Sequence, residues 1–540
     1  MNKNKIILST IASLCLYGSL NAATFDFDNA TPNFGNSISS SIDGVTLTVT
    51  STSTIYKATF GIGTDTGIML NNANANNLTF TFDKAINLTS LQYITPVTPG
   101  ANSFILNPTG GTGNNALTIY QQDWNLQDLN TNWNGITGFV IDESTNTALS
   151  RIAFDNFVFT LANTKTYLDS AVLANAESNT KRSAQTLQNI KDNGSYTAMS
   201  SVFTALDNVS TDSQKAQKIE ETTPQTATSS VSASNHVAQG ISNIVTQRQN
   251  VNLGAGINSG DEMFVEKNIW FKPFGSIGKQ NDKDGINGFD INTYGLAFGI
   301  DGEYEENQTF GLGFFYTNAN VEVNNVQQSS DLDVFSLVAY GSNPIIDNKT
   351  KLMYQLGYAI QKNDSSRFVS LTSDTATSKY TSKTASVDLK VLRDYRVSED
   401  LLLQPMISST YRHFSNPSYS ETGASALNLD VQKFTTTELL VGLGTMAHYK
   451  LNETSKIIAN ANVDYDLHDR TTTVTSSYQG ASGVTFDTDG IDNGRWSYDV
   501  GVAYENQIDD LSNINFSYNY QGKGSDYSNN VISAKYTYKF

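Results

Sequence analysis

Apolar and polar residues alternate along the chain from about residue 263 to the last residue. In the run 294–300, for example, Tyr, Leu, Phe and Ile alternate with Gly and Ala, and about a dozen similar runs follow, separated by turns and loops. Successive strand side chains point to opposite faces, so each run predicts a strand with one apolar face and one small or polar face. A packed soluble core would need larger inward residues. The pattern therefore favours a membrane β-barrel over residues 261–540 rather than a large soluble β domain.

The last of these runs, "NVISAKYTYKF", has an apolar face that continues to its final residue. Ile532, Ala534, Tyr536, Tyr538 and Phe540 share this face. In water such a strand would expose both its apolar face and an unpaired edge. We therefore expect its apolar face to meet lipid and both of its edges to be paired.

Residues 23–163 carry a different pattern, in which short strand-like runs are separated by clusters of Asn, Gly, Thr and Ser. The clearest runs lie at 45–52, 78–86, 136–142 and 152–161. Short alternating runs bounded by turn residues are typical of antiparallel β structure. We predict a small antiparallel β-sandwich for this region.

Residues 164–260 switch to apolar residues at helical spacing among Ala, Gln, Ser, Thr and Lys. The apolar stripes are narrow and the residues between them are small, which is poor material for a self-contained helical bundle. The region is therefore predicted to be a helical linker.

The first 22 residues have Lys3 and Lys5, an apolar stretch from Ile6 to Leu16, and small residues at their end. This is the pattern of a secretory signal peptide, and we predict residues 1–22 to be one. The single cysteine of the chain, Cys15, lies within it. The exported part is therefore expected to have neither a disulfide nor a thiolate metal site.

Composition agrees with exported β structure, because 26 Tyr and 27 Phe accompany only 9 Pro. Beyond the signal segment, no apolar run is long enough for a membrane helix. The net charge of −18 argues against nucleic acid as a partner, because phosphate binding requires clustered Lys and Arg.

The stretch 268–304, beginning "NIWFKPFGSIGKQ", resembles the autotransporter β-domain of type V secretion systems, as do 401–424 and the Phe-terminated last strand. The resemblance implies an outer-membrane barrel of about twelve strands, a helix in its lumen and an N-terminal passenger delivered outside the cell. It also implies that Tyr536, Tyr538 and Phe540 form an assembly signal for the barrel-assembly machinery. Independently, we expect Arg248 and His236 of a helix around 231–248 either to find polar partners on the lumen wall or to be solvated.

The passenger region 24–163 contains neither His nor Cys, so it cannot build a nucleophile activated by a histidine base. Its only Glu, Glu143, lies beside Asp142 at a strand end, which does not support an opposed carboxylate pair for sugar hydrolysis. We therefore predict no enzymatic activity. A glycan-active enzyme passenger on the same barrel and a porin-like channel remain the alternatives.

Two tryptophans, Trp124 and Trp133, lie in the stretch "YQQDWNLQDLNTNWNGI", which is rich in Asn, Gln and Asp. Aromatic faces stack on sugar rings while such polar side chains bond hydroxyl groups. The two residues are therefore either ligand-binding, for a glycan or host-surface ligand, or part of the sandwich core. The predicted role of the passenger is that of an adhesin or binding module.

The segments "FDFDN" and "FDNF" suggest a calcium site, and no other cofactor is expected. The candidate ligands are Asp26, Asp28, Asp155 and Asn156. The first and last strands of many jelly-roll modules lie together, which would bring these oxygens close. Calcium ligands must converge from several segments, so the alternative is ordinary carboxylates at strand edges.

Overall fold

The computed structural model describes residues 22–27, 35–59, 66–70, 78–95, 103–111, 113–120, 126–143, 152–162, 165–251, 266–468 and 471–540. The predicted signal peptide lies outside these ranges apart from its last residue. The chain forms two compact units, residues 1–165 and 166–540. Within the described residues, no helix is both long and apolar enough to cross a bilayer.

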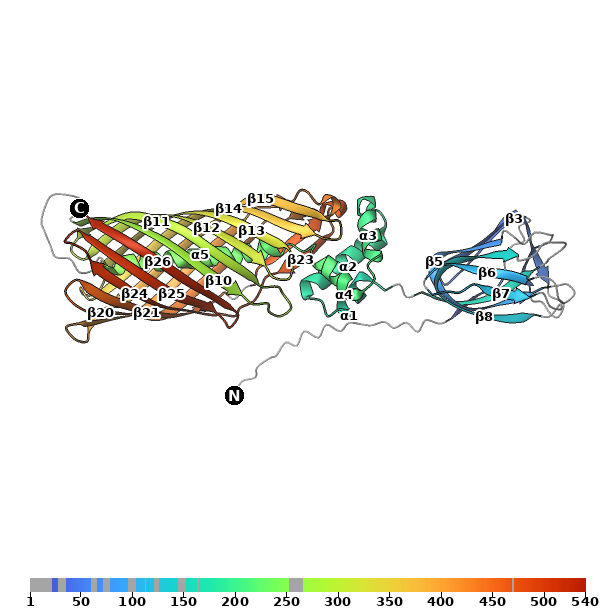
Figure 1. The fold of residues 1–540 in the computed structure, drawn as a ribbon, viewed down its shortest axis with the longest axis horizontal. Coiled ribbons are helices and arrows are strands. Elements are labelled where there is room, and N and C mark those ends of the chain that lie inside the picture. The colour runs from blue at the N-terminus through green and yellow to red at the C-terminus, as the bar shows by residue number, and fades with distance from the viewer. Residues whose placement is uncertain are drawn as a thin grey trace, which may run out of the picture. The chain divides into compact units, whose positions relative to one another are not determined.

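The first unit is built from antiparallel strands (Figure 1). They are β1 (Ala23–Phe25), β2 (Gly35–Ile42), β3 (Val45–Thr59), β4 (Thr66–Leu70), β5 (Leu78–Ile94), β6 (Ser103–Gly110), β7 (Leu117–Tyr120), β8 (Gln127–Glu143) and β9 (Ala153–Leu161). Instead of two separate sheets, the described strands form one hydrogen-bonded network, because the long strand β5 pairs with β3, β8 and β9.

Aromatic side chains fill the core of this unit. Phe80 stacks on Phe139 with ring centroids 4.3 Å apart, and Phe25 stacks on Phe159 at 4.5 Å. All four rings are buried, which follows from the alternation that places them on one face of their strands. This region therefore has its own core and is not an extension of the barrel.

The second unit begins with helices α1 (Tyr167–Leu173), α2 (Ser178–Asn193), α3 (Ser200–Asp207), α4 (Asp212–Glu220) and α5 (Gln225–Val251). Thr166 and Asp169 form a capping box at the start of α1, and Gly194 ends α2 in the left-handed conformation. Thr211 accepts a hydrogen bond from the backbone of Gln214 and so caps α4.

Twelve strands in residues 266–540 close into an antiparallel barrel. They are β10 (Glu266–Gln280), β11 (Phe289–Glu305), β12 (Gln308–Val323), β13 (Gln328–Pro344), β14 (Thr350–Val369), β15 (Asp374–Arg393), β17 (Leu401–Asn416), β20 (Phe434–Lys450), β21 (Ser455–Asp466), β24 (Trp496–Gln507), β25 (Ser512–Lys523) and β26 (Tyr527–Lys539). The last strand pairs with the first, β26 with β10, as expected from its apolar terminal face.

The two ends of the barrel differ. One end has short connections such as 306–307 and 451–454, and we call it the turn end. At the other end, a small sheet is formed by β18 (Tyr419–Ser420), β19 (Leu429–Val431), β22 (Thr473–Tyr478) and β23 (Thr485–Asp489). This second end, which we call the cap end, also carries the helices α1–α4.

Large apolar residues on the barrel strands point outward, including Leu296, Phe298, Leu312, Leu337 and Leu356. Many inward positions are small or polar, as the alternation predicted, but Trp270, Phe315 and Tyr340 place large side chains on the inner face of β10, β12 and β13. An apolar outer band of this kind belongs in hydrocarbon, and closure of the sheet leaves no free strand edge in the bilayer.

Inward glycines make room for aromatic rings from neighbouring strands. A Cβ on Gly299 would lie 2.5 Å from the Trp270 ring, and a Cβ on Gly311 would lie 2.6 Å from the Tyr340 ring. The Trp270 and Tyr340 rings belong to the same apolar cluster as residues of α5, so the helix packs on the surface that these rings help to form.

Candidate functional site: a helix in the barrel lumen and a helical cap on its mouth

Helix α5 runs through the lumen from the cap end to the turn end (Figure 1). At its start, the backbone N–H of Gln225 donates to Gln328 Oε1 at 3.1 Å, at the cap end of β13. Near its end, Arg248 contacts Asp301 at the turn end of β11. The described chain before residue 225 therefore approaches the lumen from the cap end.

One face of α5 packs on an apolar part of the barrel wall. Val237, Ile241, Ile244 and Val245 are buried there. They contact residues of β11, β12 and β13, among them Ile291, Phe315, Ala319, Val321, Leu332, Val334 and Val338. This contact explains the narrow apolar stripe of the helix, since only one side of it meets an apolar surface.

The opposite face of α5 is polar and meets charged residues on β15 and β24. Ser242 donates to Asp388 Oδ1 at 2.9 Å, and Lys390 Nζ donates to Thr246 Oγ1 at 2.5 Å. Beside this face lies a pocket whose lining includes Asp464, Asp499 and Arg412. The lumen is thus packed tightly on one side of the helix and polar on the other.

A buried ion pair fixes the end of α5. Arg248 donates through Nε and Nη2 to the two oxygens of Asp301, both at 2.6 Å, and neither side chain is more than 1% exposed. Tyr340 also donates to Asp301, at 2.7 Å, and in turn accepts from Trp270 Nε1 at 2.8 Å. The expectation of a polar partner for Arg248 on the lumen wall is confirmed.

His236, in the first half of α5, lies against the ring of Tyr527, with centroids 3.6 Å apart and the planes almost parallel. Close by, Glu438 accepts from Arg412 and Lys523 at 3.1 and 3.0 Å. The His236 ring is therefore packed against the wall instead of being solvated.

Helices α1–α4 are not a simple linker, and we correct that prediction. Buried residues of these helices, such as Leu187, Ile190 and Val202, form one apolar cluster with residues at the cap end of the barrel, such as Tyr478 and Phe486. We call α1–α4 the cap. The apolar stripes of these helices are narrow because the barrel supplies about half of the buried residues in the shared apolar cluster.

Polar contacts hold the cap against the small sheet. The buried hydroxyl of Tyr478 lies 2.7 Å from both Ser183 Oγ in α2 and Thr222 Oγ1 after α4. Asn179 and Asp489 exchange two hydrogen bonds of 2.9 Å between the Asn side chain and the Asp backbone. The residues in these contacts are between 256 and 310 positions apart in the sequence, so they could not be found from local patterns.

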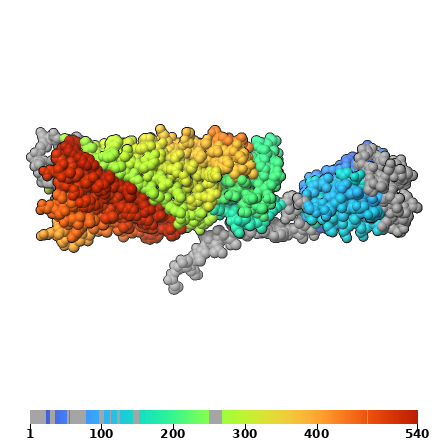
Figure 2. Space-filling model, in the orientation of Figure 1, coloured from blue at the N-terminus to red at the C-terminus, as the bar shows by residue number. Residues whose placement is uncertain are grey.

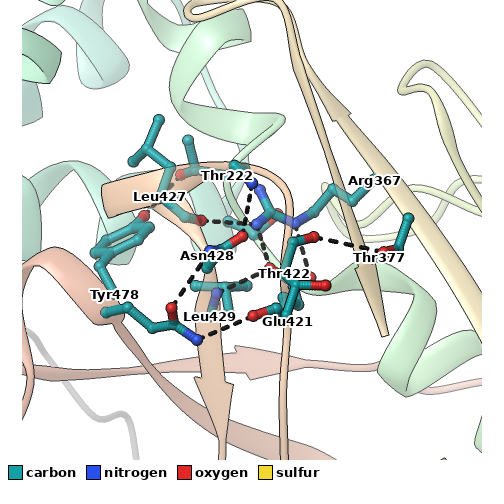
Figure 3. Close-up of polar contacts among 12 residues, drawn as sticks. Thr222, Arg367, Thr377, Glu421, Thr422, Leu427, Asn428, Leu429 and Tyr478 are labelled. Carbon is teal, nitrogen blue, oxygen red and sulfur yellow. Dashed lines mark hydrogen bonds and ion pairs between the residues drawn. The ribbon is translucent and has the colours of Figure 1, made fainter. Parts of the chain in front are cut away.

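Arg367, at the cap end of β14, joins three segments (Figure 3). Its guanidinium donates to both Glu421 oxygens, at 3.1 and 2.5 Å, to the carbonyl of Leu427 at 2.9 Å, and to the carbonyl of Glu221 at 3.0 Å. Glu221 is the C-cap of α4, where helix carbonyls carry partial negative charge. Arg367 therefore ties the end of the cap to the barrel.

Carboxylates gather where the cap meets the loop 281–288. Burial, with Glu220 and Asp282 nearby, raises the pKa of Glu177 to about 8. Burial also raises the pKa of Glu220, although its side chain accepts from Asn287 at 2.6 Å. Protonation of these groups therefore favours the docked cap.

Docking of the cap is expected to weaken as the pH rises from about 4.5 to about 8. In this window Glu177 is protonated in the docked state and ionised when the cap is released, so the docked state loses relative stability with rising pH. Proteolysis of the cap in purified protein should accelerate several-fold over this range. Glu177→Gln should flatten the profile, whereas Glu399→Gln at the turn end should leave it unchanged. A profile that Glu177→Gln does not alter would contradict the assignment.

The structure places Trp133 in the core of the N-terminal unit. It is 2% exposed, its Nε1 donates to the carbonyl of Asn115 at 2.9 Å, and its ring packs near Phe139. Trp133 therefore cannot present its ring to a ligand, and the core alternative holds for it. Trp124 lies outside the described residues.

Strand β1 pairs with β9, with Phe25 opposite Phe157, so the first and last strands of this unit lie side by side as expected, and the calcium site itself stays a prediction. Asp26 is exposed, Asp155 is buried, and Asn156 donates to Gln92 Oε1 at 2.7 Å. Asp28 lies outside the described residues. In the part of the chain that the structure describes, no three His, Cys, Asp or Glu side chains are arranged to hold a metal ion.

The three aromatic residues of the predicted assembly signal all face outward. Tyr536, Tyr538 and Phe540 are 43%, 41% and 55% exposed on the surface of β26 and the residue that follows it. They belong to the apolar outer band. Their recognition by assembly machinery remains a prediction.

The barrel is closed and has an apolar outer band, and a helix of the same chain runs through its lumen. These features define an outer-membrane β-barrel protein with one of its own segments inside the pore. Residues 269–520 match the family described as "Autotransporter beta-domain". This part of the chain is an autotransporter β-domain, and the protein is located in the outer membrane.

Similar proteins include Outer membrane protein B of Rickettsia prowazekii, 28% identical over 196 residues, and Outer membrane protein A of Rickettsia conorii, 24% identical over 262 residues. The alignments cover 34% and 46% of this chain but only 12% and 13% of those relatives. An "Extracellular serine protease" of Serratia marcescens is 27% identical over 183 residues, covering 33% of this chain and 17% of that protein.

Among solved structures, the translocator domain of autotransporter NalP from Neisseria meningitidis matches 56% of this chain and 98% of that domain, with 16% identity and a TM-score of 0.44. The transport unit of the autotransporter AIDA-I from Escherichia coli matches 54% of this chain and 97% of that unit, with 16% identity and a TM-score of 0.38.

Proposed function

We propose that the barrel delivers the N-terminal unit to the cell surface and holds it there as a binding module. The observation that supports delivery is the path of α5, which starts at Gln225 at the cap end and ends near Asp301 at the turn end. A chain that crosses the lumen in this direction has its preceding residues at the cap end. That end carries the small sheet, so we assign it to the outside and the short turns to the periplasm.

Binding without catalysis is supported by the chemistry of residues 24–163, which contain neither His nor Cys. A histidine-dependent triad of the kind used by serine proteases cannot form within this unit. Strand β7 supports a binding surface, because it lies at the edge of the sheet and its last residue, Tyr120, is 64% exposed. Leu126, just before β8, is also exposed, at 40%. The ligand class that we propose is a surface glycan or a host-matrix component.

Intact cells that express the full chain are expected to bind a glycan on an array or an immobilised extracellular-matrix coat. Trp124→Ala and Tyr120→Ala should each lower that binding by at least five-fold, because an aromatic face contributes about 1 kcal/mol or more on stacking. Thr81→Ala, on an exposed strand position away from β7, is the matched control and should retain binding. Surface levels measured with an antibody exclude a loss of expression.

Absence of binding on both surfaces by cells that display the chain would contradict the binding module. Turnover of a glycan or peptide by the same cells, absent from cells that carry the barrel alone, would favour the alternative of an enzyme passenger.

A further inference from the structure

The lumen has room for one helix but not for the folded cap. Helix α5 is packed against the wall on one face and bonded to Asp388 and Lys390 on the other. A helix with its side chains is about 10–12 Å wide, and the cap sets α1, α2 and α4 side by side. The segment 166–223 therefore has to pass through the barrel unfolded or as single helices, and it can assemble only after leaving the lumen.

Once outside, the cap completes its core on the barrel. The shared cluster takes residues from α1, α2, α3 and α4 and from four cap-end segments around β14, β19, β22 and β23. Fully buried members on the two sides include Leu187 and Tyr478. Figure 2 shows the cap as one continuous surface with the end of the barrel. Neither side can bury these residues alone.

The polar contacts of the cap extend around the mouth. Asn287 reaches Glu220, Gln328 donates to the carbonyl of Thr223 at 2.9 Å, and the backbone of Ser370 donates to Glu221 at 2.8 Å. On the far side, Arg182 pairs with Asp489 at 2.7 Å. Contacts from several separate connections between strands oppose both tilting of the cap and its return into the lumen.

We propose that α1–α4 and the cap end of the barrel form a latch, which closes after the cap segment has left the lumen and fixes the chain in its exported state. This inference rests on the proposed delivery of the N-terminal unit. Docking stabilises the exported state over any state with residues 166–223 still inside the barrel. The latch thereby prevents backward movement and holds α5 in place.

The test uses single cysteines in a chain that carries Cys15→Ser. Ala184→Cys lies in the buried face of α2 and Gln185→Cys is its exposed neighbour. On intact cells, a membrane-impermeant maleimide should label Gln185→Cys at least ten-fold faster than Ala184→Cys. Equal labelling rates would show an undocked cap and overturn the proposal.

The role of docking is tested by Leu187→Asp on the cap and Arg367→Met on the barrel, with Gln185→Asp as the matched control. Either disrupting variant should make Ala184→Cys label at the rate of the exposed site. It should also lower the amount of N-terminal unit accessible to external protease by at least three-fold, at an unchanged level of heat-modifiable barrel.

Full accessibility of the N-terminal unit with the cap undocked would overturn the latch while leaving the proposed function intact. An N-terminal unit that is inaccessible in the unmodified chain would instead overturn the proposed function. If one disrupting variant fails to form a folded barrel, the other variant still tests the latch, because Leu187 lies on the cap and Arg367 lies on the barrel.

Discussion

Asp301→Asn is expected to lower the free energy of unfolding of the barrel by about 3–5 kcal/mol, because removing one partner of a buried ion pair leaves the other charge unpaired. Arg248 and Asp301 are at most 1% exposed and share two hydrogen bonds of 2.6 Å. The substituted amide keeps the shape of the carboxylate but not its charge. Denaturant titration of the purified barrel, followed by heat-modifiable mobility, measures the loss.

Asp364→Asn provides the matched control. Asp364 pairs with Lys379 at 2.6 Å, but the two side chains are 54% and 79% exposed. Exposed pairs contribute about 0–1 kcal/mol. The double variant Arg248→Met/Asp301→Asn should recover part of the loss, because the unpaired charge is then gone. Similar losses for Asp301→Asn and Asp364→Asn would contradict the buried anchor.

Leu296→Arg is expected to cost about 2–4 kcal/mol, because it places a cation on the lipid face near the middle of a spanning strand. Leu296 is 47% exposed on the outer surface of β11, between Tyr294 and Phe298 on the same face. The folded level of the barrel in outer-membrane fractions should fall, and its midpoint in denaturant should shift accordingly.

Asn292→Arg lies on the same outward face of β11, near its cap end, and serves as the control. Costs of this kind fall to about 0–1 kcal/mol near the membrane interface. An equal loss of stability at both positions would show that the cost of an arginine on the outer face of β11 does not depend on its depth in the membrane.

The barrel could be predicted from the sequence because strand alternation is local. In each run, such as 294–300, the alternation of apolar and small residues predicts which side chains point outward and which point inward. The apolar face of the last strand likewise predicts that both of its edges are paired. The pairing of β26 with β10 then follows from closure. For Arg248 the sequence left a polar partner on the lumen wall and solvation as alternatives, and the burial of its side chain decides for the partner.

The identity of that partner and the existence of the cap could not be predicted. Asp301 is 53 positions from Arg248, and Tyr478 is 295 positions from Ser183. The apolar stripes of α1–α4 look too weak for a bundle when they are read alone, since the residues that complete their core lie in β14, in the small sheet and in nearby segments between residues 369 and 486. Local periodicity reports how much apolar surface a helix has, but not what covers it.

In the N-terminal unit, too, local periodicity did not predict what covers each apolar residue. An alternating pattern predicted β structure, yet it could not distinguish a tryptophan in the core from one at the surface. Trp133 lies on the inward face of β8, where its indole N–H meets the carbonyl of Asn115. Strand β5 pairs with three other strands, and its register shifts along the pairings with β8 and β9. No local sequence motif predicts these shifts.

If the chain passes through its own barrel and emerges at the cap end, the N-terminal unit and the short turns lie on opposite sides of the outer membrane. A protease is added to intact cells that carry one engineered cleavage site, either in the N-terminal unit at Gly113 or in the short turn at Asn307. Cleavage is expected at the Gly113 site on intact cells and at the Asn307 site only after the outer membrane is permeabilised. Cleavage at the Asn307 site on intact cells, with the Gly113 site protected until permeabilisation, would contradict this path of the chain.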